Sequence, residues 1–228
     1  MRKLILALLA ALVFFTGCNK QDSYTYSGIE AGSIDAGVFT SDNGTKMTIA
    51  GNTEKFDVNT SRRVLVSYET EPVTDPTHIR INLLGLLDAG ILQPVHVRSI
   101  PADPTGFPLE VNDAWFSDKY LNILATFDGK EPDKHIFTAT YTVDDQGLSI
   151  RLDHDGAQDT TTGNDPLSIF LCVPMYEPVL SYEQQAQAAG KKPVYPVPVL
   201  LQWTARTLEG GPLTLLERKG SYRPSSAD

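Results

Sequence analysis

Short runs in which apolar and polar residues alternate recur along most of the chain, and sequences typical of turns separate them. The clearest run places Ile79, Ile81 and Leu83 on one side of an extended backbone, with polar residues between them, which is the pattern of a half-buried strand. Five such runs occupy the first half, at 38–40, 46–50, 64–69, 78–84 and 95–100. Five short strands within about 65 residues are typical of a small closed or nearly closed barrel.

A proline-rich stretch interrupts this pattern near the middle of the chain. Pro101, Pro104 and Pro108 each fix φ and lack an amide donor, so neither a helix nor a central strand is expected there. Six further runs follow, at 120–127, 136–143, 148–153, 167–173, 197–205 and 213–217. We therefore predict an all-β protein with a small β-barrel domain at 35–105 and a β-sandwich domain at 106–228.

One segment has the punctuation of a helix. Ser181 can cap an N-terminus, and Gln184 stands three residues later to return the bond. Gly190 followed by Pro193 ends the predicted helix after Ala189. The helix lies in an excursion of about 20 residues between two predicted strands, and a loop of that length is usually functional or disordered.

Three tyrosines and two lysines accompany this excursion, namely Tyr176, Tyr182, Tyr195, Lys191 and Lys192. Tyrosine combines a large contact area with a polar tip and is enriched at interfaces, and the lysines place positive charge on an acidic chain. These five residues are our candidates for partner binding. The alternative is that the helix covers an open edge of the sandwich and that the tyrosines pack inward.

The N-terminus has the features of a bacterial lipoprotein signal. Two basic residues precede the apolar stretch 4–15, which is too short to span a bilayer. Cys18 follows it within Phe-Thr-Gly-Cys, which resembles a lipobox. We therefore expect residues 1–17 to be a signal peptide, Cys18 to carry lipid, and 18–34 to be a lipidated tether. The alternative is a secretory peptide whose cysteine is incidental or forms a disulfide with Cys172.

Lipid at Cys18 would hold the protein on a membrane, and we expect the outer membrane, on either its periplasmic or its cell-surface face. Cys172 then has no disulfide partner. It lies in an apolar run between Pro166 and Pro174 without a neighbouring base in the sequence, so we expect a buried structural thiol.

Charge and composition exclude several function classes. The 228 residues include 19 Lys and Arg against 28 Asp and Glu, a net charge of −9, which repels phosphate backbones and argues against a nucleic-acid partner. The sequence contains no Gly-x-Ser-x-Gly, Walker or dinucleotide-binding signature, and no cofactor is expected. Arg62, Arg63 and Arg80 lie in or directly before the barrel runs, where protection of strand edges explains them better than ligand binding.

The strongest acidic cluster contains Asp153, Asp155 and Asp159. Oxygen ligands at alternate positions of a turn can hold a hard cation such as calcium, so these acids are weak metal candidates, although a solvated loop is the simpler explanation. The four histidines lack zinc-site spacing. Carboxylates of the sandwich loops also leave open a glycan-processing enzyme.

The second half opens with residues 112–123, whose sequence is NDAWFSDKYLNI. With the lipobox and the short β domain before it, this segment resembles the NigD-like lipoproteins of Bacteroides and relatives. The resemblance implies an N-terminal OB-like β-barrel and a C-terminal β-sandwich, carries no catalytic residues, and brings an association with bacteriocin immunity. We predict a lipid-anchored envelope protein that binds another envelope or extracellular protein, or a glycan, without catalysis.

Overall fold

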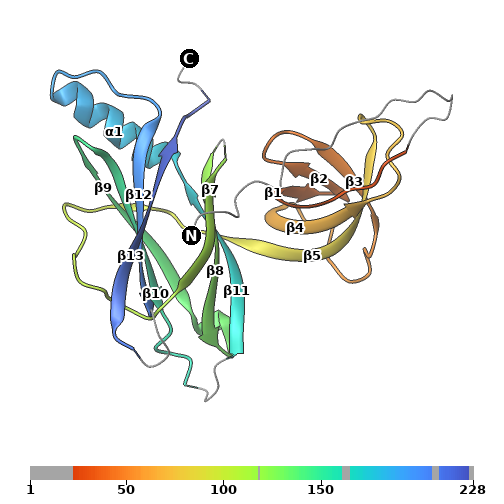
Figure 1. Cartoon of the computed structure of the whole chain (residues 1–228), viewed down its shortest axis with the longest axis horizontal. Helices are drawn as coiled ribbons and strands as arrows, with labels where there is room; N and C mark the ends of the chain where they lie inside the picture. Colours follow the sequence, from red (N-terminus) through yellow and green to blue (C-terminus); the bar gives the residue numbers. More distant parts are fainter. Residues whose placement is uncertain (1–22, 118, 161–164, 207–210, 226–228) are drawn as a thin grey trace, which may run out of the picture.

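The computed structural model describes residues 23–117, 119–160, 165–206 and 211–225. Within these ranges the chain forms strands β1 to β13, the short 3-10 helix η1 (Pro132–Lys134) and the α-helix α1 (Tyr176–Ala188), as Figure 1 shows. The predominance of strands confirms the expected all-β class. The predicted signal peptide and Cys18 lie outside the described residues, and no helix within those ranges is long and apolar enough to cross a membrane.

Five strands of the first half pair in a closed ring. They are β1 (Ser27–Asp35), β2 (Val38–Ser41), β3 (Lys46–Gly51), β4 (Arg62–Thr70) and β5 (Ile79–Ile91). Antiparallel pairs join β1 to β2 and β4, β2 to β3, and β4 to β5, and the parallel pair β3–β5 closes the ring. Ile79, Ile81 and Leu83 belong to its buried interior, as their alternation predicted.

β1 begins within the segment 18–34 that the sequence predicted to be a tether, and from Ser27 onward this segment is a strand paired with β4. The glycines of β1 interrupt the alternation of apolar and polar residues by which a strand is predicted. A Cβ on Gly32 would lie 2.2 Å from the carbonyl oxygen of Thr40 and 2.6 Å from the ring of Phe39. Gly32 therefore permits close packing inside a strand, whereas the sequence alone suggested a flexible segment.

The second half consists of two packed sheets. The first continues from β5 through β11 (Asp165–Pro174), β8 (Tyr120–Gly129) and β7 (Glu110–Phe116). The second has the order β13 (Leu213–Tyr222), β12 (Val197–Arg206), β10 (Gly147–Asp155), β9 (Ile136–Asp144) and β6 (Val95–His96). Apolar side chains from both sheets form one core, including Ile123, Phe127, Ile150, Leu171 and Leu201. β7 was not predicted, because a register shift between Val111 and Asp113 breaks its alternation.

α1 begins at Tyr176, earlier than the predicted start at Ser181. Pro178 lies in its first turn, where the missing amide hydrogen costs no helical bond. The predicted end is confirmed, since Ala189 is the C-cap and Gly190 follows it with a φ of +69°, the left-handed conformation that glycine adopts without strain.

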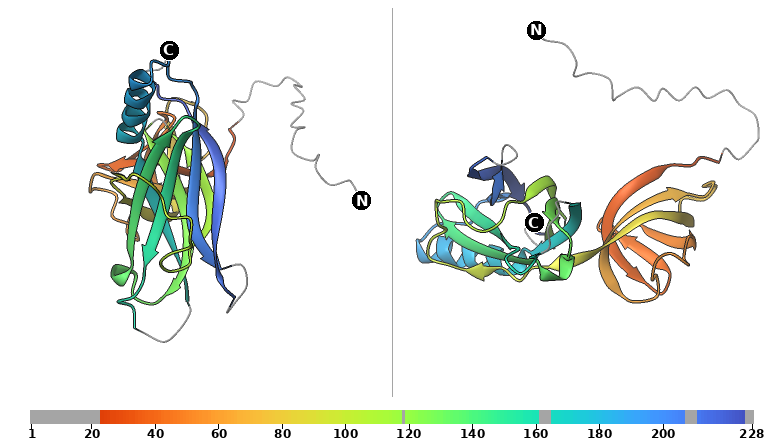
Figure 2. Two further views of the ribbon diagram at one scale, coloured as in Figure 1. Left: turned by 90° about the vertical axis from the view of Figure 1, so that its left-hand side faces the viewer. Right: turned by 90° about the horizontal axis from the view of Figure 1, so that it is seen from below.

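The helix closes one end of the sandwich. Val179 and Tyr182 are buried in the core that both sheets share, and the hydroxyl of Ser181 lies 2.8 Å from that of Tyr141 on β9. In Figure 1 and in the left view of Figure 2, α1 lies beside this end of the strands. Ser181 therefore serves as a contact inside the helix instead of as its cap.

Residues 97–109, here called the strap, cross the outer face of the second sheet. The backbone of Val97 donates to Tyr141, and that of Phe107 donates to His154. Near the middle of the strap, the Thr204 hydroxyl accepts from the backbone N–H of Thr105 at 3.1 Å and donates to its carbonyl at 2.7 Å. The proline-rich segment therefore covers the sheet and is held to it by hydrogen bonds.

β5 belongs to both halves of the molecule. It pairs with β3 and β4 in the ring, and its residues 89–91 pair in parallel with β11 of the sandwich, so the strand passes from one half to the other in the right view of Figure 2. A small core lies where the halves meet, formed by Ala31, Leu65, Phe170 and Cys172.

Arg63 on β4 connects this junction through polar contacts. Its two terminal nitrogens each donate to a carboxylate oxygen of Asp42 at 2.8 Å, and one of them also donates to Asn122 at 2.6 Å. Its Nε donates to the Cys172 sulfur at 3.1 Å, and its guanidinium carbon lies 4.1 Å from the centre of the Tyr120 ring. The expected edge-protecting role is therefore wrong for Arg63, whose side chain is 12% exposed.

Arg63→Met should reduce the free energy of unfolding by about 2 kcal/mol. The value lies between the roughly 1 kcal/mol of an exposed ion pair and the roughly 3 to 5 kcal/mol of a broken buried one, because the substitution removes the partner of Asp42, whose side chain is only 22% exposed. Urea unfolding measures the change. Arg80→Met is the matched control, since Arg80 is 57% exposed in its pair with Glu71 and should cost no more than about 1 kcal/mol. Equal small losses would contradict the junction role.

Candidate functional site

A groove of about 400 Å³ lies beside α1 and is the first candidate site. Most of its wall is apolar or aromatic, formed by Tyr120, Pro174, Met175, Tyr176, Val179, Leu180, Tyr222 and Pro224. Lys119 and Glu183 add one charge of each sign. Tyr176 is 72% exposed, so most of this amphipathic side chain is free to contact a partner at the groove.

The structure does not bring the five predicted partner-binding residues together in one groove. Tyr182 is buried, and its hydroxyl accepts from the backbone N–H of Val194 at 3.2 Å. The Tyr195 hydroxyl donates to Glu183, and burial together with that carboxylate raises the pKa of Tyr195 to about 12.

Lys191 forms an exposed ion pair with Asp145 at 2.8 Å, whereas Lys192 is exposed. Lys191 is therefore neutralised by its neighbour. Of the predicted set, Tyr176 alone lines the groove beside α1.

A second concavity, the junction cleft, has a volume of about 320 Å³ and lies between the ring and the sandwich. Arg63, Asp42 and hydroxyl side chains of β1 and β2 form its wall on the ring side. Ser117, Lys119 and Tyr120 form the other wall. Lys119 and Tyr120 therefore separate the junction cleft from the α1 groove, since both residues line both spaces.

Cys172 is a free, fully buried thiol, as its apolar sequence predicted. Its surroundings differ from the prediction, because the sulfur accepts from Arg63 at 3.1 Å and the thiol donates to Asn122 at 3.3 Å. Burial raises the pKa of Cys172, and the adjacent guanidinium only partly opposes this. The thiol therefore serves as a packing and bonding element of the junction.

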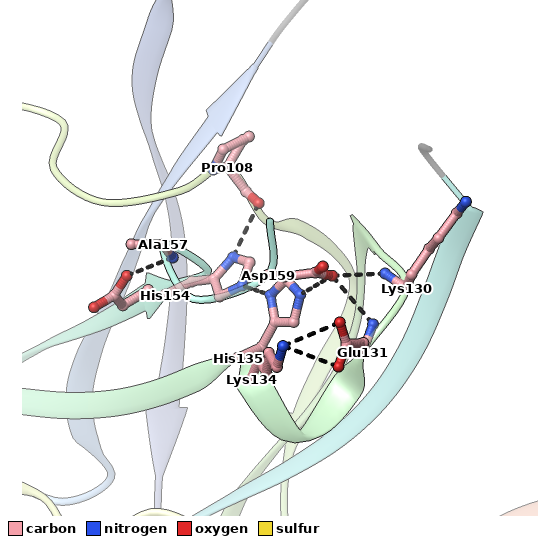
Figure 3. Close-up of polar contacts among 9 residues, drawn as sticks. Pro108, Lys130, Glu131, Lys134, His135, His154, Ala157 and Asp159 are labelled. Atoms are coloured by element: carbon pink, nitrogen blue, oxygen red, sulfur yellow. Dashed lines mark hydrogen bonds and ion pairs between the residues drawn. The ribbon is translucent and has the colours of Figure 1, made fainter. Parts of the chain in front are cut away.

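Two histidines and an aspartate form a buried chain of polar contacts, which Figure 3 shows. Nδ1 of His135 lies 2.8 Å from Nε2 of His154, and Nε2 of His135 lies 3.2 Å from a carboxylate oxygen of Asp159. The same oxygen accepts from the backbone N–H groups of Lys130 and Glu131. Sequence spacing gave no sign of this histidine chain, because its members come from three segments.

The contacts of the histidine chain determine where its protons lie. The carbonyl oxygen of Pro108, 3.2 Å from Nδ1 of His154, can only accept. Burial lowers the pKa of His154, so this ring is neutral and its Nε2 accepts from His135. The other nitrogen of His135 faces a carboxylate oxygen of Asp159 at 3.2 Å.

Each of the three aspartates that were metal candidates contacts a different part of the protein. Asp153 accepts from Nε of Arg151 at 3.1 Å, Asp155 accepts from the backbone of Ala157, and Asp159 belongs to the histidine chain. Among the residues that the structure describes, no group of three or more His, Cys, Asp or Glu side chains is arranged to hold a metal ion. The structure thus does not bring the three aspartates together.

The segment 112–123 contains the residues that sequence reasoning failed to assign to a site. Trp115 stacks on Phe170 with ring centres 6.0 Å apart, Tyr120 lies against the Arg63 guanidinium, and Asn122 accepts from it. The aromatic and amide residues that recur in this motif were the sequence feature that could have indicated a structural role. They build the junction, and the turn within the motif carries Lys119.

Acidification should destabilise the protein through His154. The pKa of His154 in the unfolded chain is about 6.5, and in the folded protein it is lower. As the pH falls below about 6.5, the unfolded chain therefore binds a proton before the folded protein does. The free energy of unfolding then decreases by up to about 1.4 kcal/mol per pH unit. His154→Phe keeps an aromatic ring beside Phe127 and Phe137 and should flatten this decrease in urea unfolding between pH 7 and 5. The exposed His96→Gln is the control. An unchanged slope in His154→Phe would refute the assignment.

Comparison with known proteins gives matches in structure. No family model and no curated protein matches the chain. A NigD-like immunity protein from Bacteroides caccae is 18% identical with a TM-score of 0.57, covering 88% of this chain and 98% of that one. A protein of unknown function from Bacteroides vulgatus is 14% identical with a TM-score of 0.57, covering 89% and 94%. A candidate lipoprotein from Bacteroides fragilis is 13% identical with a TM-score of 0.60, covering 89% and 100%.

At these low sequence identities the comparisons show a similar fold and nothing about function. It extends over both halves of the molecule, because nearly the whole length of each chain is covered. The resemblance found in residues 112–123 is confirmed to that extent: the chain has the fold of a NigD-like immunity protein and of further Bacteroides proteins.

Proposed function

We propose that the protein is a lipid-anchored protein of the outer membrane that binds another envelope or extracellular protein in the groove beside α1, without catalysis. In this proposal Cys18 carries the lipid, the ring of β1 to β5 is an OB-like barrel next to the anchor, and the sandwich presents the groove. The lipobox-like sequence before Cys18 supports the anchor. A candidate lipoprotein among the proteins of similar fold is consistent with it.

The exposure of Tyr176 at the groove is the observation that carries this proposal. An aromatic side chain that is 72% exposed beside Met175, Val179 and Leu180 resembles the arrangement of interfaces, where aromatic residues surround a pocket for a partner's apolar anchor. A volume of about 400 Å³ accepts one or two large side chains.

The competing function is a glycan-processing enzyme that uses acids of the sandwich loops. It requires two carboxylates roughly 5 to 10 Å apart across a cleft. Asp153, Asp155 and Asp159 each make separate contacts within the protein, and none of them lines the groove or the junction cleft. These three aspartates therefore give the glycan-processing alternative no support.

Bacteriocin immunity is a special case of the same proposal, in which the bound partner is a toxin. The Bacteroides caccae protein of similar fold is described as an immunity protein. For this chain the argument is one of fold alone, so we propose immunity as a subclass of partner binding.

Replacing Cys18 by Ser should move the protein from the membrane fraction to the soluble fraction, because the acyl chains that hold it would be lost. Cell fractionation with immunoblotting measures this. Cys172→Ser is the matched control and should stay with the membrane, since Cys172 is buried in the junction. Retention of the Cys18→Ser protein on membranes would refute the anchor, and protease shaving of intact cells distinguishes the two faces.

A photo-crosslinking residue, p-benzoylphenylalanine, in place of Tyr176 should give a discrete crosslinked partner in intact cells. The same residue in place of Tyr24, which is 55% exposed on the ring side, is the control and should not give it. Leu180→Asp should abolish the product at position 176, because a charge would enter the apolar wall, while the melting temperature reports on folding. The same products from both positions, or none at position 176, would contradict the proposed groove.

A further inference from the structure

The second sheet of the sandwich ends in an exposed edge strand, β13. Among the described residues, β13 pairs with β12 along one side and with no strand along the other. All positions from 216 to 221 are exposed. The free side of an edge strand presents unpaired amide and carbonyl groups, so β13 can accept a further strand.

Proteins commonly protect such an edge by making the strand short or by interrupting it with a bulge. Two other strands at sheet edges of the sandwich follow this rule. β6 has two residues, and β7 has a register shift between Val111 and Asp113. The ten residues of β13, in contrast, pair with β12 without any shift. β13 is therefore a long and regular edge.

Three consecutive charged residues, Glu217, Arg218 and Lys219, lie in the middle of the exposed segment. Successive side chains of a strand point to opposite faces of the sheet. Glu217 and Lys219 therefore share one face, whereas Arg218 points to the other face and donates to Asp113 of β7 at 3.0 Å.

Glu217 and Lys219 have no counter-charge within the sheet. On β12 the residues directly opposite them are Gln202 and Leu200, which are uncharged. Neither side chain forms an ion pair with a described residue. Both charges are therefore available to a strand that pairs with the free side of β13.

The order of these charges matches a second copy of the same strand in one register. Two β13 strands related by a twofold axis through the sheet pair antiparallel, with one residue opposite its own copy. If that residue is Arg218, Glu217 faces Lys219 of the second copy and Lys219 faces Glu217. If it is Glu217 or Lys219, like charges face each other, which is destabilising. Each Arg218 at the axis is neutralised by its own Asp113.

We propose that two copies of the protein form a dimer by antiparallel pairing of their β13 edges over positions 215–221, with Arg218 at the twofold axis. The second sheet then continues from one copy into the other, and backbone hydrogen bonds join the two edges. Two pairs of Glu217 with Lys219 fix the register. This surface goes beyond the proposed function, because it takes a second copy of the chain and uses no residue of the α1 groove.

Single cysteines in the full-length protein, oxidised mildly in intact cells, test the register. Arg218→Cys should give a reducible dimer, because directly opposite Cα atoms of an antiparallel pair lie about 4.5 to 5.5 Å apart, which is within disulfide range. Glu217→Cys and Lys219→Cys should each give little dimer, since equivalent positions are then displaced by roughly 7 Å along the strand. Expressed together, these two variants should crosslink to each other. The parent protein, whose Cys172 is buried, is the control.

Exchange of the charges tests what selects the dimer. Glu217→Lys or Lys219→Glu alone places like charges opposite each other at two symmetric positions. Each should raise the dissociation constant of the dimer roughly tenfold or more in sedimentation of the detergent-solubilised full-length protein. The double variant Glu217→Lys with Lys219→Glu should restore the dimer. Lys192→Glu, at an exposed position outside β13, is the matched control and should leave it unchanged.

A protein that is monomeric at every concentration would overturn the proposal. So would equal crosslinking at positions 217, 218 and 219, or a double charge exchange that remains as weak as the single ones. A crosslinked product at position 218 that contains a different protein would show that the edge binds another partner. The substituted positions are exposed, and melting temperatures report on folding. Tyr176 lies outside β13, so the crosslinking test of the groove and these experiments fail independently.

Discussion

The guanidinium of Arg63 contacts groups from three other segments at once, and these contacts tie the two halves of the molecule to each other. β5 links the halves through its backbone, but a strand can bend and twist, so continuity alone leaves their angle undetermined. Arg63 contacts the turn after β2 through Asp42, β8 through Asn122 and β11 through Cys172. A planar group with donors in fixed directions accepts only one such arrangement, and a lysine could not replace it. Burial makes the arrangement obligatory, because an unpaired guanidinium there would be costly.

This constraint also explains why both concavities lie near one turn. The turn between β7 and β8 carries Lys119 and leads into Tyr120, whose ring lies against Arg63. On one side of these two residues is the α1 groove, and on the other is the junction cleft. The motif in residues 112–123 is thus a structural element of the junction whose turn borders both spaces.

Buried polar groups restrict the sandwich in a similar way. The strap brings the carbonyl of Pro108 to His154 and the hydroxyl of Thr105 to Arg151, so a proline-rich segment satisfies polar groups that it also covers. The histidine chain then ties β10 and the residue just before β9 to the loop that holds Asp159. Each of these contacts is worth little as a net gain, yet losing one member leaves a desolvated group unpaired. The histidine chain is therefore a structural element of the sandwich, and none of its members lines the α1 groove or the junction cleft.

The sequence by itself determined the all-β class, most strands and the end of α1, because alternation and a helix-ending glycine act over a few residues. It missed β1, whose Gly32 is required by a neighbouring strand, and β7, whose register shift removes the periodic signal. It also read Arg63 as a surface residue and the acids of the 153–159 segment as one cluster. Only the tertiary structure decided these points, since Arg63 meets Cys172 across 109 positions and Asp159 meets His135 across 24. Such pairings depend on how the sheets close in space, and no local pattern of hydrophobicity or charge records that closure.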